Sequence, residues 1–141
     1  PPIEAAVAPL SRRFPSWVGV YPGFDEGLAR KMFAGADFLL MPSRFEPCGL
    51  SQMSAQRFGC LPIAHATGGL IDTIEDGVTG LLFDSADADA LRRCVQRAFR
   101  TYRMPGLLSA MRRAAMLRPG SWDLAGSHYL RLYDRVLERQ A

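Results

Sequence analysis

Short apolar runs alternate along the chain with longer segments that have the periodicity of helices. The runs predict four strands, at residues 17–21, 38–41, 61–64 and 80–83, with helices between them at residues 25–35, 49–58 and 68–74. The run FLLM at residues 38–41 is apolar throughout, as expected of a strand that is covered on both faces. Strands that alternate with helices favour a parallel sheet. The sequence therefore predicts an α/β fold whose sheet part covers about residues 15–84.

The remainder of the chain, about residues 87–139, is predicted to be helical. Its first helix follows a capping residue, Ser85 or Asp87, and ends at Pro105-Gly106. One face of that helix is apolar and consists of Leu91, Val95, Ala98, Phe99 and Tyr102. Two further helices are predicted, and the last carries an apolar stripe made of Tyr129, Leu130, Tyr133, Val136 and Leu137. These helices span residues 107–116 and 121–137. Core packing is the simplest explanation of the stripe, and docking onto a partner domain is the alternative.

Composition places the chain among ordinary globular domains. Its 141 residues suffice for one domain, and a hydrophobic share of 48% with a charged share of 22% excludes a disordered chain. The net charge of +3 comes from scattered arginines, as in Arg12-Arg13 and Arg92-Arg93. Scattered arginines indicate solvated helix faces, because a nucleic-acid interface gathers its basic residues on one face. We therefore expect no nucleic-acid partner.

The cysteines and the lengths of the apolar runs indicate the cellular compartment of the protein. Cys48, Cys60 and Cys94 are odd in number and have no paired spacing, which argues against a disulfide framework and fits a reducing compartment. No group of cysteine and histidine residues has the spacing of metal ligands. No apolar run approaches the roughly 18 residues of a membrane span, and no signal segment opens the chain. We expect a cytoplasmic protein that has no metal site and does not contact a membrane.

Two junctions between a strand and a helix carry the candidate chemistry, residues 42–52 (PSRFEPCGLSQ) and residues 66–70 (ATGGL). In an open parallel sheet, ligands bind at the carboxyl ends of the strands, where both junctions are expected to lie. Gly49 and the pair Gly68-Gly69 lack side chains, so a phosphate is able to approach the backbone. Free N–H groups at a helix start favour an anion there, and Ser51 adds a hydroxyl donor.

Glu46 does not suit a phosphate, because an acid repels an anion. It suits a sugar in either of two ways. The carboxylate is able to accept hydrogen bonds from sugar hydroxyl groups, and it is able to stabilise positive charge that develops on the sugar ring. The alternatives are that the glycines only form turns and that Glu46 is an acid favoured by the helix dipole. The motifs G-x-G-x-x-G and G-x-x-x-x-G-K-[ST] do not occur. The pattern by itself therefore supports an α/β domain with a candidate phosphate site.

A longer stretch resembles a known family. Residues 36–50 (ADFLLMPSRFEPCGL) resemble the signature of bacterial glycogen synthases and plant starch synthases. The resemblance continues in order over nearly the whole chain, with GFDE at residues 23–26, TGGLIDT at 67–73, DGVTGLLF at 76–83, SW at 121–122 and YLRLY at 129–133. The R-F-E-P-C-G-L run is highly specific to this family.

The resemblance implies a fold and an activity. Such enzymes are of the GT-B type, with two Rossmann-like domains facing a cleft, and they transfer glucose from ADP-glucose to the non-reducing end of an α-1,4-glucan with retention and without a metal. Residues 1–141 would be a partial C-terminal nucleotide-sugar-binding domain, truncated at its N-terminus. The N-terminal catalytic domain would be absent. The first strands of the C-terminal domain would be absent too, and with them the Arg/Lys pair that stabilises departing ADP. Because such electrostatic stabilisation is a large share of catalysis, we expect the isolated chain to be inactive.

The resemblance also implies site residues. By motif position, Glu46 is the catalytic acid that contacts the transferred glucose. The residues expected to bind ADP-glucose are Phe24, Cys48, Gly49, Leu50, Ser51, Thr67, Gly68 and Gly69. Phe24 replaces a tyrosine that stacks on adenine, and an aromatic face suffices for stacking. His65 stands where an arginine is expected in the family's P-[IV]-V-R-x-T-G-G run, and we interpret it as a strand-end residue without a special role.

Other interpretations stay open. The chain could be an isolated adenine-nucleotide-binding or interaction module, or a degenerate relic without catalysis. A sucrose-metabolising transferase of the same architecture is a third possibility, against which the R-F-E-P-C-G-L run argues. The choice between ADP-glucose and UDP-glucose as donor also stays open. An unpaired sheet edge and exposed apolar surface would favour self-association.

Overall fold

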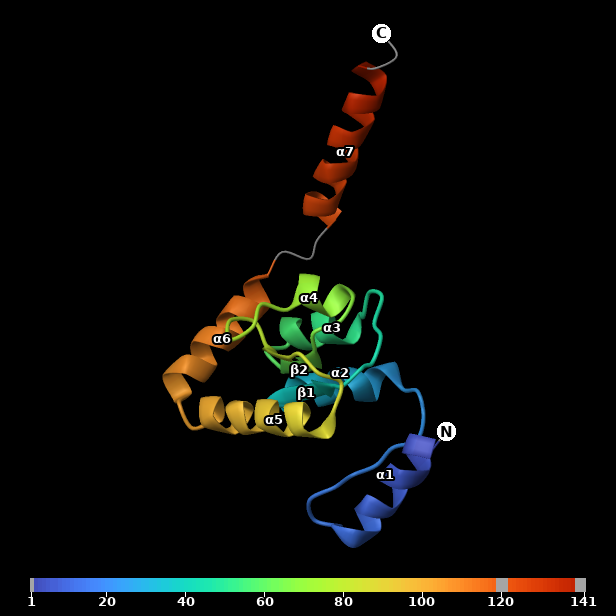
Figure 1. Ribbon diagram of the computed structural model, residues 1–141, viewed down its shortest axis with the longest axis vertical. Coiled ribbons are helices and arrows are strands. Elements are labelled where there is room, and N and C mark those ends of the chain that lie inside the picture. The colour runs from blue at the N-terminus through green and yellow to red at the C-terminus, as the bar shows by residue number, and fades with distance from the viewer. Residues whose placement is uncertain (1, 119–121, 139–141) are drawn as a thin grey trace.

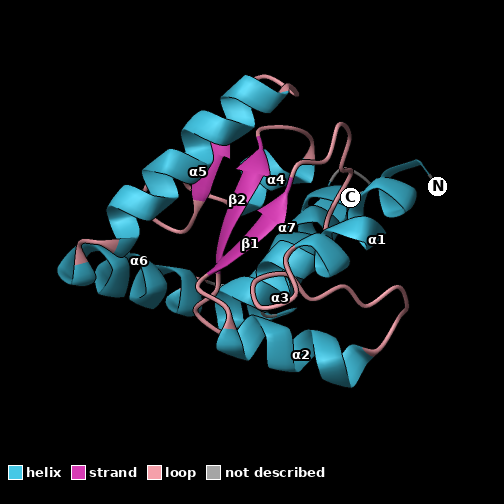
Figure 2. Cartoon of the chain, turned by 90° about the horizontal axis from the view of Figure 1, so that it is seen from below, coloured by secondary structure: helices cyan, strands magenta, loops and turns pink. Residues whose placement is uncertain are grey.

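A parallel sheet forms the centre of the molecule. The computed structural model describes residues 2–118 and 122–138, with side chains placed for residues 5–118 and 126–138. The sheet has the order β1-β2-β3, with β1 at Phe38–Met41, β2 at Leu61–His65 and β3 at Leu81–Phe83. Figure 2 shows the three strands pointing in the same direction with helices on both sides. The predicted α/β fold with a parallel sheet is confirmed.

Helices cover both faces of this sheet, so the fold has three layers (Figure 1). One face packs against α5 (Ala88–Tyr102) and α6 (Pro105–Leu117) through Leu61, Ile63, Leu81 and Phe83. The other face packs against α4 (Gly69–Thr73) through Ala64, with Met41 and Leu82 beside it. Also on this side lie α3 (Ser51–Arg57) and α2 (Glu26–Gly35). Alternate residues of each strand thus point into different layers, as the pleat of a strand requires.

Local signals in the sequence define the ends of two helices. The Asp25 carboxylate accepts a hydrogen bond from the Leu28 N–H at 2.9 Å and caps α2. The Asp87 carboxylate accepts from the Ala90 N–H at 2.8 Å and caps α5, which confirms one of the two predicted caps. Pro105 was predicted to end a helix, and it also begins the next one as the first residue of α6. A proline is favourable there, because the first N–H of a helix has no intrahelical partner to lose.

In the first part of the chain, one prediction was wrong and one helix was not predicted. Residues 17–21 form no strand, and Trp17 is 89% exposed. A strand needs the N–H and C=O groups of a neighbouring strand, and none of the three strands lies beside this segment. A helix, α1 (Pro2–Arg13), precedes it and was not predicted, and Pro9 lies inside it.

The apolar faces of two later helices also differ from the prediction. In α5 the buried residues are Ala90, Cys94, Ala98 and Thr101, whereas Phe99 is 62% exposed. Small side chains face the sheet because α5 lies close against β3, and the larger predicted residues flank this stripe. The last helix, α7 (Trp122–Glu138), projects away from the sheet (Figure 1), and its stripe is exposed. Core packing of that stripe is therefore wrong for this chain.

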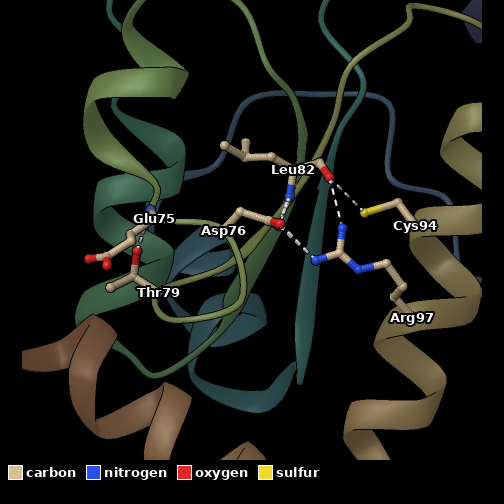
Figure 3. A network of polar contacts seen from close by, with 6 residues as sticks. All are labelled: Glu75, Asp76, Thr79, Leu82, Cys94 and Arg97. Carbon is tan, nitrogen blue, oxygen red and sulfur yellow. Dashed lines mark hydrogen bonds and ion pairs between the residues drawn. The ribbon is translucent and has the colours of Figure 1, made fainter.

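Side chains cover the outer edge of β3. The Asp76 carboxylate accepts a hydrogen bond from the Leu82 N–H at 2.7 Å, and the Arg97 guanidinium donates to the Leu82 carbonyl at 3.2 Å. Arg97 also donates to both Asp76 oxygens, at 2.8 and 2.9 Å (Figure 3). The backbone groups that another strand would need are thus occupied, so the sheet ends at β3. No helix in the described residues is long and apolar enough to cross a membrane.

Candidate functional site

The two predicted loops meet at one edge of the sheet. Residues 42–50 follow β1 and residues 66–68 follow β2, and these strands are parallel neighbours. The Gly69 N–H donates a hydrogen bond to the Glu46 carbonyl at 2.9 Å, which joins the loops directly. The position at the carboxyl ends of the strands is the one where open parallel sheets bind ligands.

The loops pack backbone against backbone, and the glycines allow it. A Cβ atom on Gly68 would lie 2.1 Å from the Glu46 carbonyl oxygen. A Cβ atom on Gly69 would lie 2.8 Å from the Pro47 carbonyl oxygen and 2.9 Å from the Cys48 Cα. Gly68 also has a φ of +48°, in the region that disfavours other residues. The protein itself therefore fills the space that the missing side chains leave at both positions.

A buried glutamine supports the first loop from below. The Gln52 side chain is fully buried, and its Nε2 donates to the Gly49 carbonyl at 2.7 Å and to the Thr73 hydroxyl at 3.0 Å. The Thr73 hydroxyl in turn donates to the Gly69 carbonyl at 2.6 Å. Gly49 has a φ of +60°, and a Cβ there would lie 2.5 Å from the Gln52 Oε1. Gln52 thus ties the first loop to the start of α4.

Sequence reasoning missed this supporting role, although a signal was present. Gln52 and Gln56 lie four residues apart, on the inward face of α3, where an amphipathic helix normally has apolar residues. The Gln56 side chain donates to the Thr73 and Thr79 carbonyls, both at 3.1 Å. Buried amides at helical spacing indicate that loop carbonyls need donors.

The Glu46 carboxylate belongs to the first loop. Its side chain is half-buried, and the Ser43 hydroxyl donates to its Oε2 at 3.4 Å. The neighbouring Phe45 and Leu50 are 76% and 72% exposed, and the Cys48 thiol is free and exposed. The carboxylate therefore keeps acceptor capacity for a ligand's hydroxyl groups.

The predicted supply of free amides holds for only one of the two helices. At α4, the N–H groups of Gly69, Leu70 and Ile71 donate to the carbonyls of Glu46, Thr67 and Gly68. At α3, the first N–H with a backbone partner is that of Ser54, which bonds to the Leu50 carbonyl at 3.0 Å. The prediction of free amides at the start of α4 was wrong, because the Gly69 N–H bonds to the first loop and the Leu70 and Ile71 N–H groups bond to carbonyls of the second loop itself. Within the described residues, the amides of residues 51–53 make no backbone hydrogen bond.

Phe24 lies apart from the two loops. It precedes α2 and is 94% exposed, so its ring packs against neither loop. Among the residues that the structure places, no group of three histidine, cysteine or acidic side chains is arranged to hold a metal ion. Burial raises the pKa of the Cys60 thiol to about 11 and also raises the pKa of the Cys94 thiol.

Residues 18–115 match the family model of "Glycosyl transferases group 1". The chain belongs to the group 1 glycosyl transferases. It is 75% identical over 136 residues to a glycogen synthase of Xanthomonas oryzae pv. oryzae, which covers 96% of this chain and 27% of that protein. It is 55% identical over 139 residues to a glycogen synthase of Pseudomonas fluorescens, which covers 99% of this chain and 28% of that protein.

Solved structures of other glycosyl transferases have the same fold. The catalytic domain of starch synthase IV from Arabidopsis thaliana, bound to ADP and acarbose, matches 94% of this chain and 29% of that chain, with a TM-score of 0.82 and 32% identity. A sucrose-phosphate synthase from Thermosynechococcus elongatus matches 96% of this chain and 34% of that chain, with a TM-score of 0.69 and 25% identity. The resemblance to glycogen and starch synthases is confirmed. This glycosyl transferase chain spans less than a third of the length of the relatives it matches.

Proposed function

We propose that this chain is the donor-binding part of a retaining glucosyltransferase, which transfers glucose from ADP-glucose to the non-reducing end of an α-1,4-glucan. The observation that carries the proposal is the interlocked pair of loops around Glu46, in a chain 75% identical to a glycogen synthase. The starch synthase of similar structure is bound to ADP and acarbose. An adenine nucleotide and a glucan analogue are the ligand types that the proposal requires.

Glu46 is proposed to contact the transferred glucose. An ionised carboxylate only accepts hydrogen bonds, and sugar hydroxyl groups donate them. The Gly69 N–H bonds to the Glu46 carbonyl at 2.9 Å, and the Ser43 hydroxyl lies 3.4 Å from the Glu46 Oε2. A carboxylate held in this way stabilises positive charge on the sugar ring without having to reorganise, which is how electrostatic catalysis gains most.

The remaining site residues are proposed to divide between the nucleotide and the sugar. Residues 48–50 line the sugar and phosphate pocket, and the Ser51 hydroxyl lies beside the pyrophosphate together with the unbonded amides of residues 51–53. Thr67, Gly68 and Gly69 shape the pocket from the second loop by holding the first loop close. Phe24 stacks on adenine, for which its exposed ring is suited.

We further propose that residues 1–141 are a partial C-terminal domain of a longer cytoplasmic protein whose N-terminal domain completes the active site. The relatives are more than three times as long as this chain, which supports the proposal. Transfer also needs positive charge to stabilise departing ADP, and the two loops contribute none beyond Arg44. The isolated chain is therefore expected to bind the donor and not to turn it over.

Calorimetric titration with ADP, ADP-glucose and UDP-glucose tests the proposal. We expect weak binding that prefers the adenine ligands. Gly49→Val should abolish it, because the new side chain collides with Gln52. Glu46→Ala should retain ADP binding and remove any advantage of ADP-glucose over ADP. Gly106→Ala, at a position with open space, serves as the control. Equal binding of UDP-glucose, or binding that survives Gly49→Val in a folded variant, would refute the proposal.

A further inference from the structure

His65 lies between the loop that follows β1 and the loop that follows β3, the two outer strands. It is the last residue of β2, the central strand, and its side chain is half-buried. Its Nδ1 lies 2.8 Å from the Ser43 carbonyl oxygen, in the loop after β1. Its Nε2 lies 3.3 Å from the Asp84 carbonyl oxygen, after β3. One imidazole ring thus spans the loops on both sides of the central strand.

The two contacts of the ring differ in length, and the difference indicates which ring nitrogen carries the hydrogen. A carbonyl oxygen only accepts hydrogen bonds, so a ring nitrogen that bonds to it must carry a hydrogen. A neutral imidazole has one such nitrogen. The Ser43 contact of 2.8 Å lies within the usual range for N–H···O bonds, whereas 3.3 Å to Asp84 lies just outside it. The neutral ring is therefore expected to carry its hydrogen on Nδ1 and to donate to Ser43.

Neighbouring groups pack against the His65 ring and connect it to the Glu46 loop. The Phe83 ring packs against it at 5.5 Å between centroids, with 35° between the planes. The hydroxyl of Ser43, whose carbonyl the ring holds, lies 3.4 Å from the Glu46 Oε2, which is longer than an ordinary O–H···O bond. The Glu46 carbonyl in turn accepts the Gly69 N–H at the start of α4. A continuous series of contacts therefore runs from His65 through Ser43 to Glu46 and Gly69.

We propose that His65 is a positioning residue, which fixes the Glu46 loop in its donor-binding conformation through the hydrogen bond from Nδ1 to the Ser43 carbonyl. This inference rests on the proposed function and adds a residue to it. His65 touches neither donor nor acceptor in this role. Its position at the end of the central strand lets it brace the loop from the rigid part of the fold, as a well-defined binding site requires.

Two substitutions separate the hydrogen bond from the packing. His65→Phe keeps a ring beside Phe83 and removes the Nδ1 donor. His65→Asn places an amide nitrogen at the position of Nδ1 and so keeps the bond to Ser43. Hydrogen exchange of the Gly69 amide in the 141-residue chain reports on the loop, and the amides of α5 and α6 report on global stability. We expect His65→Phe to accelerate Gly69 exchange about fivefold relative to those amides, and His65→Asn to stay within about twofold of the wild type.

Two further measurements give the proposal independent tests. Nitrogen NMR of the His65 ring should show the hydrogen of the neutral form on Nδ1, and a hydrogen on Nε2 would overturn the inference. Titration with ADP-glucose should show about fivefold weaker binding for His65→Phe than for His65→Asn. Unchanged Gly69 exchange in His65→Phe, or equal behaviour of the two variants, would also overturn it. If the wild type binds no adenine ligand, the proposed function fails, whereas exchange and NMR still decide the role of His65.

Discussion

The close packing of the two loops makes Gly69→Ala an informative substitution. The added Cβ would lie 2.8 Å from the Pro47 carbonyl oxygen and 2.9 Å from both the Cys48 Cα and the Cys48 carbonyl oxygen. All three are backbone atoms, so no flexible side chain is able to move aside. The loops must part by roughly half an ångström before these contacts reach ordinary van der Waals distances. The hydrogen bond from the Gly69 N–H to the Glu46 carbonyl lengthens with that movement.

The expected loss of stability follows from these contacts. Overpacking in a close-packed region costs about 1–3 kcal/mol, and one weakened hydrogen bond costs about 1 kcal/mol. Alanine is more favourable than glycine in a helix by roughly 0.5–1 kcal/mol, which offsets part of the loss. We therefore expect the free energy of unfolding to fall by about 1–3 kcal/mol.

Gly106→Ala isolates the helix term, because Gly106 lies in the first turn of α6 with no atom within 4 Å of the added Cβ. This control should be neutral or stabilising by up to about 0.5–1 kcal/mol. Urea denaturation followed by circular dichroism measures both variants, and equal m-values make their midpoints comparable. If Gly69→Ala is as stable as Gly106→Ala, the loops are not packed as described, and the structural argument for Gly68-Gly69 fails.

Three further predictions concern the cysteines, the sheet edge and the assembly. The pKa of Cys60 is raised to about 11 by burial, with the Asp37 carboxylate as a smaller cause. An unfolded Cys60 ionises at lower pH than the folded one, so Cys60 should lower the stability between about pH 9 and 11, by at most about 1.4 kcal/mol per pH unit. Because the pKa of Cys94 is raised as well, Cys60→Ala should reduce the fall in stability seen in urea titrations without abolishing it. Arg97→Met should lower the free energy of unfolding by at most about 1 kcal/mol, since the ion pair of Arg97 with Asp76 is partly exposed. It should nevertheless promote association through the uncovered edge of β3. Light scattering measures this association, with Arg92→Met as the control. The wild-type chain should itself associate at high concentration through the exposed α7 stripe, and sedimentation of a clean monomer would contradict this.

The sequence was sufficient for the elements whose signals are local. The strand at 38–41 and the Asp25 and Asp87 caps were predictable, because an apolar run between breakers and a carboxylate before a helix act over a few residues. Residues 17–21 show the limit. Their apolar run is as strong as the others, but a strand depends on hydrogen bonds from a neighbour that lies elsewhere in the chain.

The candidate site shows the same division. The motif around Glu46 and the pair Gly68-Gly69 identify two loops and, through resemblance, a family that the comparisons confirm. The sequence did not reveal why the glycines are needed. A phosphate cradle and a backbone contact both demand the absence of a side chain, and only the positions of the Glu46 and Pro47 carbonyls distinguish them.

Periodicity, caps and motifs along the chain were enough to predict the fold class, the family and the order of strands and helices from residue 25 onward, but not the elements before it. The tertiary structure decided which amides remain free, which face of α5 is buried and what His65 contacts. Each of these depends on atoms far apart in sequence. Ser43 and His65 are separated by 22 residues, and they meet only because β1 and β2 are parallel neighbours whose carboxyl ends share one edge of the sheet.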